Sequence, residues 1–168
     1  MTVEIRRATL KDIKEILPVW GQLADFHSTL DPAFTPSTQW PREYGAYLRS
    51  LLTRDDAIAV VAKAEGDIVG YAVGRVTMLP PFFEHRYRDY IHDVFVKPQL
   101  RRHGVGRRLV DAVLQWLHQH EVVLVELTVA ANNDAIAFWK QLGFSVYMQQ
   151  MKKDLRDRRP RTRDQAEL

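Results

Sequence analysis

Residues 90–108 read YIHDVFVKPQLRRHGVGRR, and this stretch contains the transition that decides the fold. The apolar residues up to Val96 predict a strand, which Pro98 ends. A turn containing Gly104 and Gly106 follows, and apolar residues then recur at helical spacing as far as about His120. The sequence therefore predicts a strand that enters a helix through a glycine-containing turn.

Such a turn can bind an anion such as phosphate. Glycine allows the sharp turn and lets backbone N–H groups approach a ligand closely. The first N–H groups of a helix have no partner inside the helix, and the helix dipole adds partial positive charge at the same point. The G-x-G spacing alone is also consistent with a structural turn flanked by solvated arginines. Four arginines add positive charge at this turn: Arg101, Arg102, Arg107 and Arg108.

The rest of the chain predicts an α/β (α+β) fold with one mixed sheet and helices on both faces. Thr9 and Asp12 form a potential capping box at the start of the first helix, in which Pro18 predicts a kink or a division. The run at 122–129 is nearly unbroken in apolar residues, so we expect a strand buried on both faces. The other predicted strands lie at 3–8, 57–64, 68–78, 90–96 and, as one strand or a pair, 144–155. The other predicted helices lie at 42–53 and between Asn132 or Asn133, as the cap, and Gly143.

Composition limits the class of protein. The 168 residues fit one domain, which we place at 1–155, followed by a basic tail at 156–168 that we expect to be disordered. The tail has no aromatic residue between its arginines, so it does not favour nucleic-acid binding. The absence of cysteine removes disulfides, thiolate metal sites and a cysteine nucleophile, and we expect no metal. No signal peptide and no apolar run of roughly 18 residues is present, so we expect a cytoplasmic protein without a membrane span.

Two motifs together resemble the GNAT superfamily of N-acetyltransferases. Val94-x-Val96-x-Pro98 followed by Arg101-x-x-Gly104-x-Gly106 is similar to that family's pyrophosphate-binding signature. Residues 132–144, NNDAIAFWKQLGF, resemble its late motif, about 30 residues further on. The resemblance extends over about residues 3–155 and implies a mostly antiparallel sheet that splays into a V between its fourth and fifth strands.

The resemblance also implies a cofactor and its site. The expected cofactor is acetyl-CoA, which serves as the acyl donor, and relatives are often homodimers. The pantetheine arm would lie in the V and pair with the backbone of Val94, Phe95 and Val96. Asn132 and Trp139 would lie near the cofactor. The pyrophosphate would lie on the loop formed by Arg101, Arg102, His103, Gly104, Val105, Gly106 and Arg107.

The implied reaction is direct attack of a primary amine on the thioester, without an acyl-enzyme. His92 is the candidate base, because an imidazole with a pKa near ~6.5 can accept a proton near neutrality. Strand alternation places it on the face of Val94 and Val96 unless a bulge intervenes, and the alternative is a histidine that only packs. On the same argument Asp93 faces the other way and is structural. Glu84, in the preceding loop, is a further candidate that could instead be a solvated acid.

Two further steps of the reaction have candidate groups. The family uses a backbone N–H, here near Val94, to stabilise the developing oxyanion. Trp139 stands where the family usually has the tyrosine that protonates the leaving thiolate, and an indole cannot do this at neutral pH. Tyr147 is a remote substitute, or a thiolate with a pKa near ~8.5 leaves unaided.

The acceptor we expect is a small-molecule amine: a polyamine, an aminoglycoside-like compound, or an amino acid or its derivative. A protein or peptide amine and a role as a non-catalytic acyl-CoA sensor remain the alternatives. Aromatic rings and carboxylates suit a cationic amine but also suit a hydrophobic core. The segments expected to form the acceptor pocket offer Trp20, Phe26, His27, Asp31, Phe34, Trp40, Tyr44, Phe82, Phe83, Glu84 and Tyr87.

Overall fold

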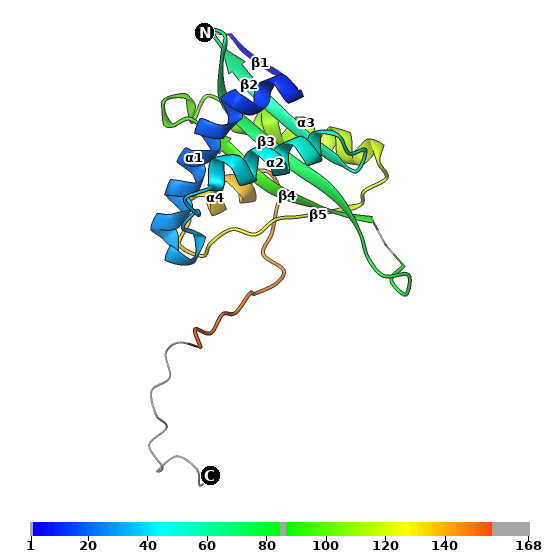
Figure 1. The fold of residues 1–168 in the computed structure, drawn as a ribbon. Coiled ribbons are helices and arrows are strands. Elements are labelled where there is room, and N and C mark those ends of the chain that lie inside the picture. Colours follow the sequence, from blue (N-terminus) through cyan, green and yellow to red (C-terminus); the bar gives the residue numbers. More distant parts are fainter. Residues whose placement is uncertain (1, 85–86, 156–168) are drawn as a thin grey trace, which may run out of the picture.

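A five-stranded sheet with helices on both faces forms the body of the computed structural model, which describes residues 2–84 and 87–155 (Figure 1). The strands are β1 (Val3–Arg7), β2 (Ala57–Ala64), β3 (Asp67–Met78), β4 (Tyr87–Val96) and β5 (Leu124–Glu126). The helices are α1 (Ile13–Leu30), α2 (Trp40–Leu52), α3 (Val105–Gln119) and α4 (Ala135–Gln141), with short 3-10 turns at Leu10–Asp12, Pro32–Phe34 and Pro98–Leu100.

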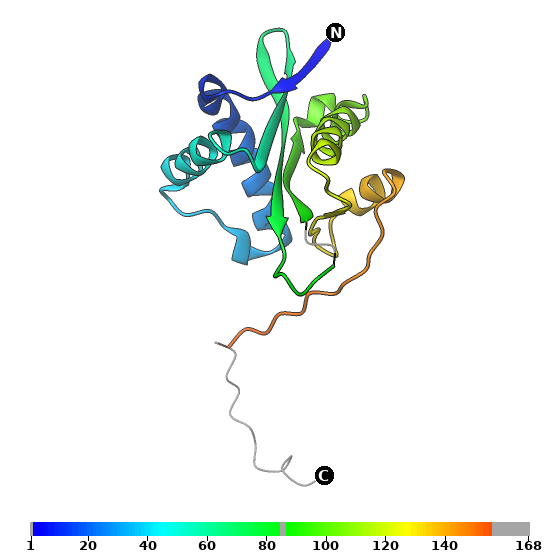
Figure 2. The ribbon, with the colours of Figure 1, turned by 90° about the vertical axis from the view of Figure 1, so that its right-hand side faces the viewer.

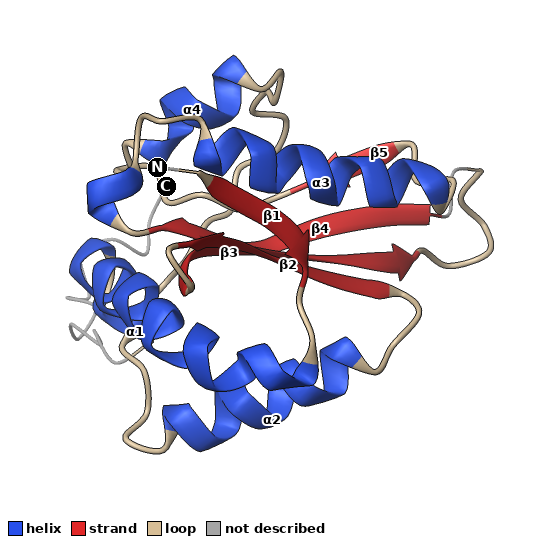
Figure 3. Cartoon of the chain, turned by 90° about the horizontal axis from the view of Figure 1, so that it is seen from above, coloured by secondary structure: helices blue, strands red, loops and turns tan. Residues whose placement is uncertain are grey.

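The strands follow one another in the sheet in the order β1-β2-β3-β4-β5. The pairs from β1 to β4 are antiparallel, and β4 pairs with β5 in parallel. The helices α1 and α2 cover one face, while α3 and α4 cover the other (Figures 2 and 3). The predicted mixed, mostly antiparallel sheet between two helical layers is therefore confirmed.

Each face of the sheet has its own hydrophobic core. One contains Ile16, Val19, Leu48 and Tyr71, and it lies between the sheet and the helices α1 and α2. The other contains side chains of β2, β3 and β4 packed on Leu109, Val110, Val113 and Leu117 of α3. Burial of both faces explains the long apolar run of β2, in which seven of eight side chains are buried.

The start of the first helix agrees with the predicted capping box. The backbone N–H and the hydroxyl of Thr9 donate to Oδ2 of Asp12, at 2.7 and 2.8 Å. Arg6 donates to both oxygens of the same carboxylate, at 2.8 and 2.7 Å. The chain makes one 3-10 turn here before α1 begins at Ile13, and Pro18 lies inside α1 without dividing it.

Strands β4 and β5 separate after a short contact. Only Arg88, Asp89 and Tyr90 pair with β5, opposite Leu124–Glu126. From Ile91 to Val96, no strand of the described chain pairs with β4 on that side. This is the predicted V-shaped splay between the fourth and fifth strands.

The predicted strand at 122–129 is wrong in its length and its burial. β5 extends only over Leu124–Glu126, and the side chains of Val123 and Leu124 are 70% and 42% exposed. β5 is the edge strand of the described sheet, and neither face of it is fully covered. The apolar run thus indicated a strand but could not indicate its place in the sheet.

The strand or pair of strands predicted at 144–155 is also absent from the structure. The segment forms no ladder and makes side-chain contacts instead, from Tyr147 to Glu126 and from Lys152 to Asp31. The apolar residues Val146, Met148 and Met151 are exposed along it. A strand needs a hydrogen-bonding neighbour, and side-chain composition alone does not provide one.

The expected disordered tail at 156–168 lies outside the described residues. Across the ranges 2–84 and 87–155, no helix combines the length and the apolar character that a membrane crossing requires.

Candidate functional site

The site is centred on an irregularity in β4. Val73 of β3 pairs with Asp93, but its neighbour Gly74 pairs with Ile91, so His92 is an extra residue on β4. An extra residue of this kind bends the strand and changes the direction of the side chains next to it. The bulge that sequence alternation left open is therefore present, and it lies at the predicted catalytic position. Beyond it, Val94 and Phe95 return to regular pairing with Ala72 and Tyr71.

Asp93 faces α2. Its Oδ2 accepts a hydrogen bond of 2.6 Å from the hydroxyl of Tyr44, a residue 49 positions away in the sequence. Burial raises the pKa of Asp93, and burial followed by the charge of Asp93 raises the pKa of Tyr44. The Tyr71 hydroxyl lies close enough to interact electrostatically with Asp93, but it is buried without a hydrogen bond of normal geometry. The carboxylate of Asp93 is thus largely shielded from water and lies next to the neutral hydroxyl groups of Tyr44 and Tyr71.

Two histidines lie within electrostatic range of Asp93. Burial lowers the pKa of His92, and the Asp93 charge opposes this effect. His27, on the last turns of α1, shows the same two influences in the same order. Part of the His92 side chain remains exposed while the rest is desolvated, and its ring lies 5.1 Å from that of Tyr90. A neutral imidazole next to a carboxylate is suited to accept a proton near neutral pH.

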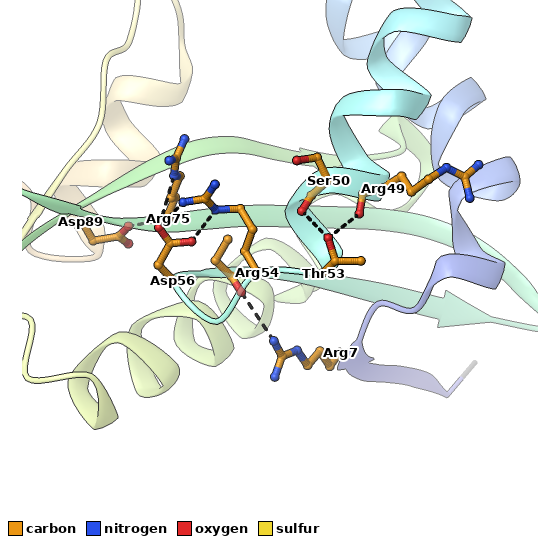
Figure 4. Close-up of polar contacts among 9 residues, drawn as sticks. Arg7, Arg49, Ser50, Thr53, Arg54, Asp56, Arg75 and Asp89 are labelled. Atoms are coloured by element: carbon orange, nitrogen blue, oxygen red, sulfur yellow. Dashed lines mark hydrogen bonds and ion pairs between the residues drawn. The ribbon is translucent and has the colours of Figure 1, made fainter.

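Asp89 lies on the opposite face of the sheet, where it contacts the backbone of β3 next to the bulge. Its Oδ1 accepts a hydrogen bond of 2.7 Å from the backbone N–H of Arg75 (Figure 4). The side chain is 1% exposed, and Oδ2 has no partner among the described residues. Burial raises the pKa of Asp89 to about 6. Only glycine fits at position 74, because a Cβ there would lie 2.7 Å from Val113 Cγ1 and 3.2 Å from Asp89 Oδ2.

The open edge of β4 carries backbone groups that could bind an extended chain. The N–H of Lys97 donates to Val69 of β3, at 2.8 Å. Because the backbone groups of successive strand residues alternate in direction, Phe95 also faces β3 and Val94 and Val96 face the open side. Arg101 Nε donates a hydrogen bond of 2.9 Å to the Val96 carbonyl. The N–H and carbonyl of Val94 and the N–H of Val96 therefore remain available on the side of the V.

The loop before α3 has the backbone shape expected of an anion site. Arg102 and Gly104 have positive φ values of 67° and 77°, and α3 begins at Val105. The first helical hydrogen bond runs from the N–H of Arg108 to Gly104. Donors earlier in the turn are therefore available to a ligand. Gly106 packs under α4, where an added Cβ would lie 3.5 Å from the Phe138 ring.

The arginines of this loop have different surroundings. Arg101 is held by the Val96 carbonyl, and its guanidinium lies 5.3 Å from the centre of the Phe95 ring. Arg107 donates to the carbonyl of Gln141, at 3.3 Å. Arg102, His103 and Arg108 are exposed. Two of the four arginines thus organise the loop.

The two predicted cofactor residues of the late motif, Asn132 and Trp139, have different surroundings. Asn132 is exposed, and its Nδ2 donates to the carbonyl of Leu30 at the end of α1, at 3.4 Å. Its neighbour Asn133 accepts from the N–H of Ala135 at 2.9 Å, but the residue at the N-cap of α4 is Asp134, so neither asparagine occupies the predicted cap position. Trp139 is half-buried between the rings of Phe138 and Phe144, with ring centres 5.1 and 5.3 Å away.

The structure brings only part of the predicted acceptor set together with Asp93. Trp20, Trp40, Tyr44 and Tyr47 form a continuous group of rings. His27 contacts the rings of Phe26 and Phe34. Phe82, Phe83 and Glu84 lie in the exposed loop after β3, and the side chain of Tyr87 lies outside the described residues. Alternation placed Asp93 on the face away from Val94 and Val96, but its pairing with Tyr44 was missed, because the sequence does not show that α2 packs on that face.

Comparison with known proteins gives a consistent result. Residues 23–144 match the acetyltransferase (GNAT) family. An uncharacterised N-acetyltransferase of Archaeoglobus fulgidus is 30% identical over 131 residues, which are 78% of this chain and 84% of the relative. The N-alpha-acetyltransferase RimI of Mycobacterium tuberculosis is 32% identical over 114 residues, 66% of this chain and 65% of the relative.

Solved structures show the same fold. A variant of the BH1408 protein of Bacillus halodurans is 28% identical and superimposes with a TM-score of 0.78, covering 90% of this chain and 99% of that one. The splayed sheet, the glycine turn before α3 and these matches agree. The chain belongs to the GNAT family of acetyl-CoA-dependent N-acetyltransferases.

Proposed function

We propose that this N-acetyltransferase transfers the acetyl group of acetyl-CoA to the primary amine of a small molecule, by direct attack and with His92 as the base. The observation that carries the proposal is the bulge in β4. It places His92 and Asp93 side by side where β4 loses its neighbour, next to the aromatic side chains of α1 and α2. An amine held there lies next to a proton acceptor and next to the open strand edge.

The cofactor would be held by backbone groups. The pantetheine arm would hydrogen-bond to Val94 and Val96 in the V, with Phe95 contributing packing from the other face. The loop that comprises Arg101, Arg102, His103, Gly104, Val105, Gly106 and Arg107 would bind the pyrophosphate through its N–H groups. Asn132 and Trp139 would flank the opening from the side of α4.

The reaction would proceed in three steps. The ammonium group of the acceptor loses a proton to His92, whose pKa burial lowers and the charge of Asp93 raises. The free amine attacks the thioester carbon, and the N–H of Val94 donates to the oxygen as negative charge develops. The C–S bond then breaks and the CoA thiolate leaves, while the nitrogen releases its second proton to solvent to give the neutral amide. Trp139 packs between two rings and supplies no proton, so we assign it to packing next to the pantetheine arm.

A second candidate acceptor is the N-terminal amine of a protein or peptide. The relative from Mycobacterium tuberculosis, which bears the name of an N-alpha-acetyltransferase, favours it. The partly withdrawn carboxylate and its aromatic surroundings favour a small acceptor.

The test is thiol release from acetyl-CoA by the purified protein, with polyamines, aminoglycosides, amino acids and short peptides as acceptors. We expect turnover with a small amine, a loss of at least a hundredfold in kcat for His92→Ala, and turnover close to that of the wild type for Trp139→Phe. Unchanged turnover in His92→Ala would exclude this base. Turnover with peptides alone would establish the second acceptor class.

A further inference from the structure

The group of residues around Asp93 combines one acid with several aromatic rings. The Tyr44 hydroxyl donates to Asp93, and the Tyr44 ring stacks on Trp20 with ring centres 4.2 Å apart. The ring centre of Tyr47 lies 5.6 Å from that of Tyr44. Burial, followed by the charge of Asp93, raises the pKa of Tyr47. We call Asp93, Trp20, His27, Tyr44, Tyr47 and Tyr71 the Asp93 cluster.

Asp93 forms no ion pair with a lysine or arginine in the described part of the chain. Its hydrogen-bonding partner is a neutral phenol. A carboxylate withdrawn from water without a cationic partner is unfavourable, and this arrangement is characteristic of binding and catalytic sites. The group that would neutralise it is a single ammonium.

The rim of the cluster is apolar. His27 contacts Phe26 and Phe34, with ring centres 5.9 and 6.3 Å apart. Phe26, Tyr47 and Phe34 are 38%, 39% and 59% exposed, so aromatic surface continues outward from the acid. A ligand whose ammonium reaches Asp93 would therefore have its remaining atoms in contact with rings.

Two acids on the neighbouring segments, Asp31 and Glu43, are already engaged. Asp31, after α1, accepts from the N–H of Ala33 and pairs with Lys152. Glu43, on the first turn of α2, accepts from the hydroxyl of Ser37, at 2.6 Å. An additional ammonium of a polycation that approached Asp31 or Glu43 would have to displace one of these contacts.

We propose that the acceptor is a small monoamine whose one ammonium is attached to an aromatic body, and that Asp93 and Phe34 select it. This inference rests on the proposed function and narrows its substrate class. It predicts that polyamines and aminoglycosides are poor acceptors, because their additional charges would face rings rather than carboxylates. Asp93 binds the ammonium before His92 takes its proton.

The experiment compares matched acceptors in the thiol-release assay: 2-phenylethylamine, n-butylamine, putrescine, kanamycin and a tetrapeptide with an N-terminal phenylalanine. We expect kcat/KM for 2-phenylethylamine to exceed that for each of the others at least tenfold. Phe34→Ala should reduce that advantage over n-butylamine severalfold, whereas Val123→Ala, which shortens an exposed apolar side chain on another part of the surface, should leave it unchanged. Asp93→Asn should raise KM for 2-phenylethylamine at least tenfold without changing the Kd for CoA.

A binding measurement distinguishes failure of the proposed transferase activity from failure of the inference about which amine is recognised. Titration of 2-phenylethylamine into the CoA complex reports recognition without turnover. Binding that Phe34→Ala weakens, without turnover of any amine, would overturn the proposed function and retain the inference about recognition. Preference for putrescine, kanamycin or the tetrapeptide would overturn the inference and leave the transferase in place. An advantage for 2-phenylethylamine that Phe34→Ala does not reduce would also overturn it.

Discussion

The carboxylate of Asp89 should make the stability of this protein depend on pH in a direction opposite to that of most acids. The side chain is 1% exposed, Oδ2 has no partner among the described residues, and burial raises its pKa from 3.8 to about 6. Above pH 6 the folded state holds a buried charge that the unfolded state exposes to water. As the pH falls through 6, the folded state gains a proton that the unfolded state does not yet bind. The free energy of unfolding therefore rises between pH 6 and about 4.

The size of this effect follows from the two pKa values. The full difference corresponds to at most about 3 kcal/mol, and between pH 8 and pH 5 it amounts to about 1.4 kcal/mol. Asp89→Asn removes the charge and retains an oxygen that can accept from the N–H of Arg75. The stability of Asp89→Asn relative to the wild type should thus decrease by about 1.4 kcal/mol from pH 8 to pH 5.

Urea unfolding of both proteins at pH 8, 7, 6 and 5 measures this difference. Groups that titrate in both proteins, including the histidines and Asp93, cancel in the comparison. Asp56→Asn is the control: the hydrogen bond from Arg54 lowers the pKa of Asp56, so its effect should be the same at all four pH values. Parallel pH profiles for the wild type and Asp89→Asn would refute the reasoning, because they would show that Asp89 has an ordinary pKa in the folded state.

Two other predictions concern the N-terminal cap and the cofactor loop. Asp12→Ala should lower the free energy of unfolding by about 3 kcal/mol, because it removes the partner of Arg6 and the acceptor for Thr9; urea unfolding measures it, and a loss below 1 kcal/mol would contradict it. The hydrogen bond from Arg6 lowers the pKa of Asp12, so this stabilisation should be complete above about pH 4 and be lost as the pH falls further. Gly106→Val should raise the KM for acetyl-CoA at least tenfold, because its branched side chain would press on the Phe138 ring and displace the first turn of α3 with its N–H groups, while Gly66→Asn, in an open hairpin turn with φ of 92°, should not change it. Equal KM values in these two variants would show that the loop does not bind the cofactor.

Several local elements of the fold could be predicted from the amino-acid sequence alone. The capping box of Thr9 and Asp12, the hairpin turn at Gly66, the turn at Gly104 and the end of α4 at Gly143 all lie where residue chemistry places them. These features depend on backbone conformations that glycine favours and on hydrogen bonds between residues close in sequence. They could be read without knowledge of distant contacts, and so could the resemblance that rests on them.

Tertiary structure decided the rest, because the features concerned depend on pairing between distant segments. The bulge at His92 follows from the register of β4 against β3, and the packing of α2 on the sheet brings Tyr44 to Asp93. The alternation of residues within β4 does not predict this register, because the register depends on the pairing with β3. Likewise, the residues at 144–155 have the composition of a strand but no neighbour to pair with in the described chain. Strand composition is a property of the segment, whereas a ladder, a bulge and the contact of Asp93 with Tyr44 are properties of two segments brought together.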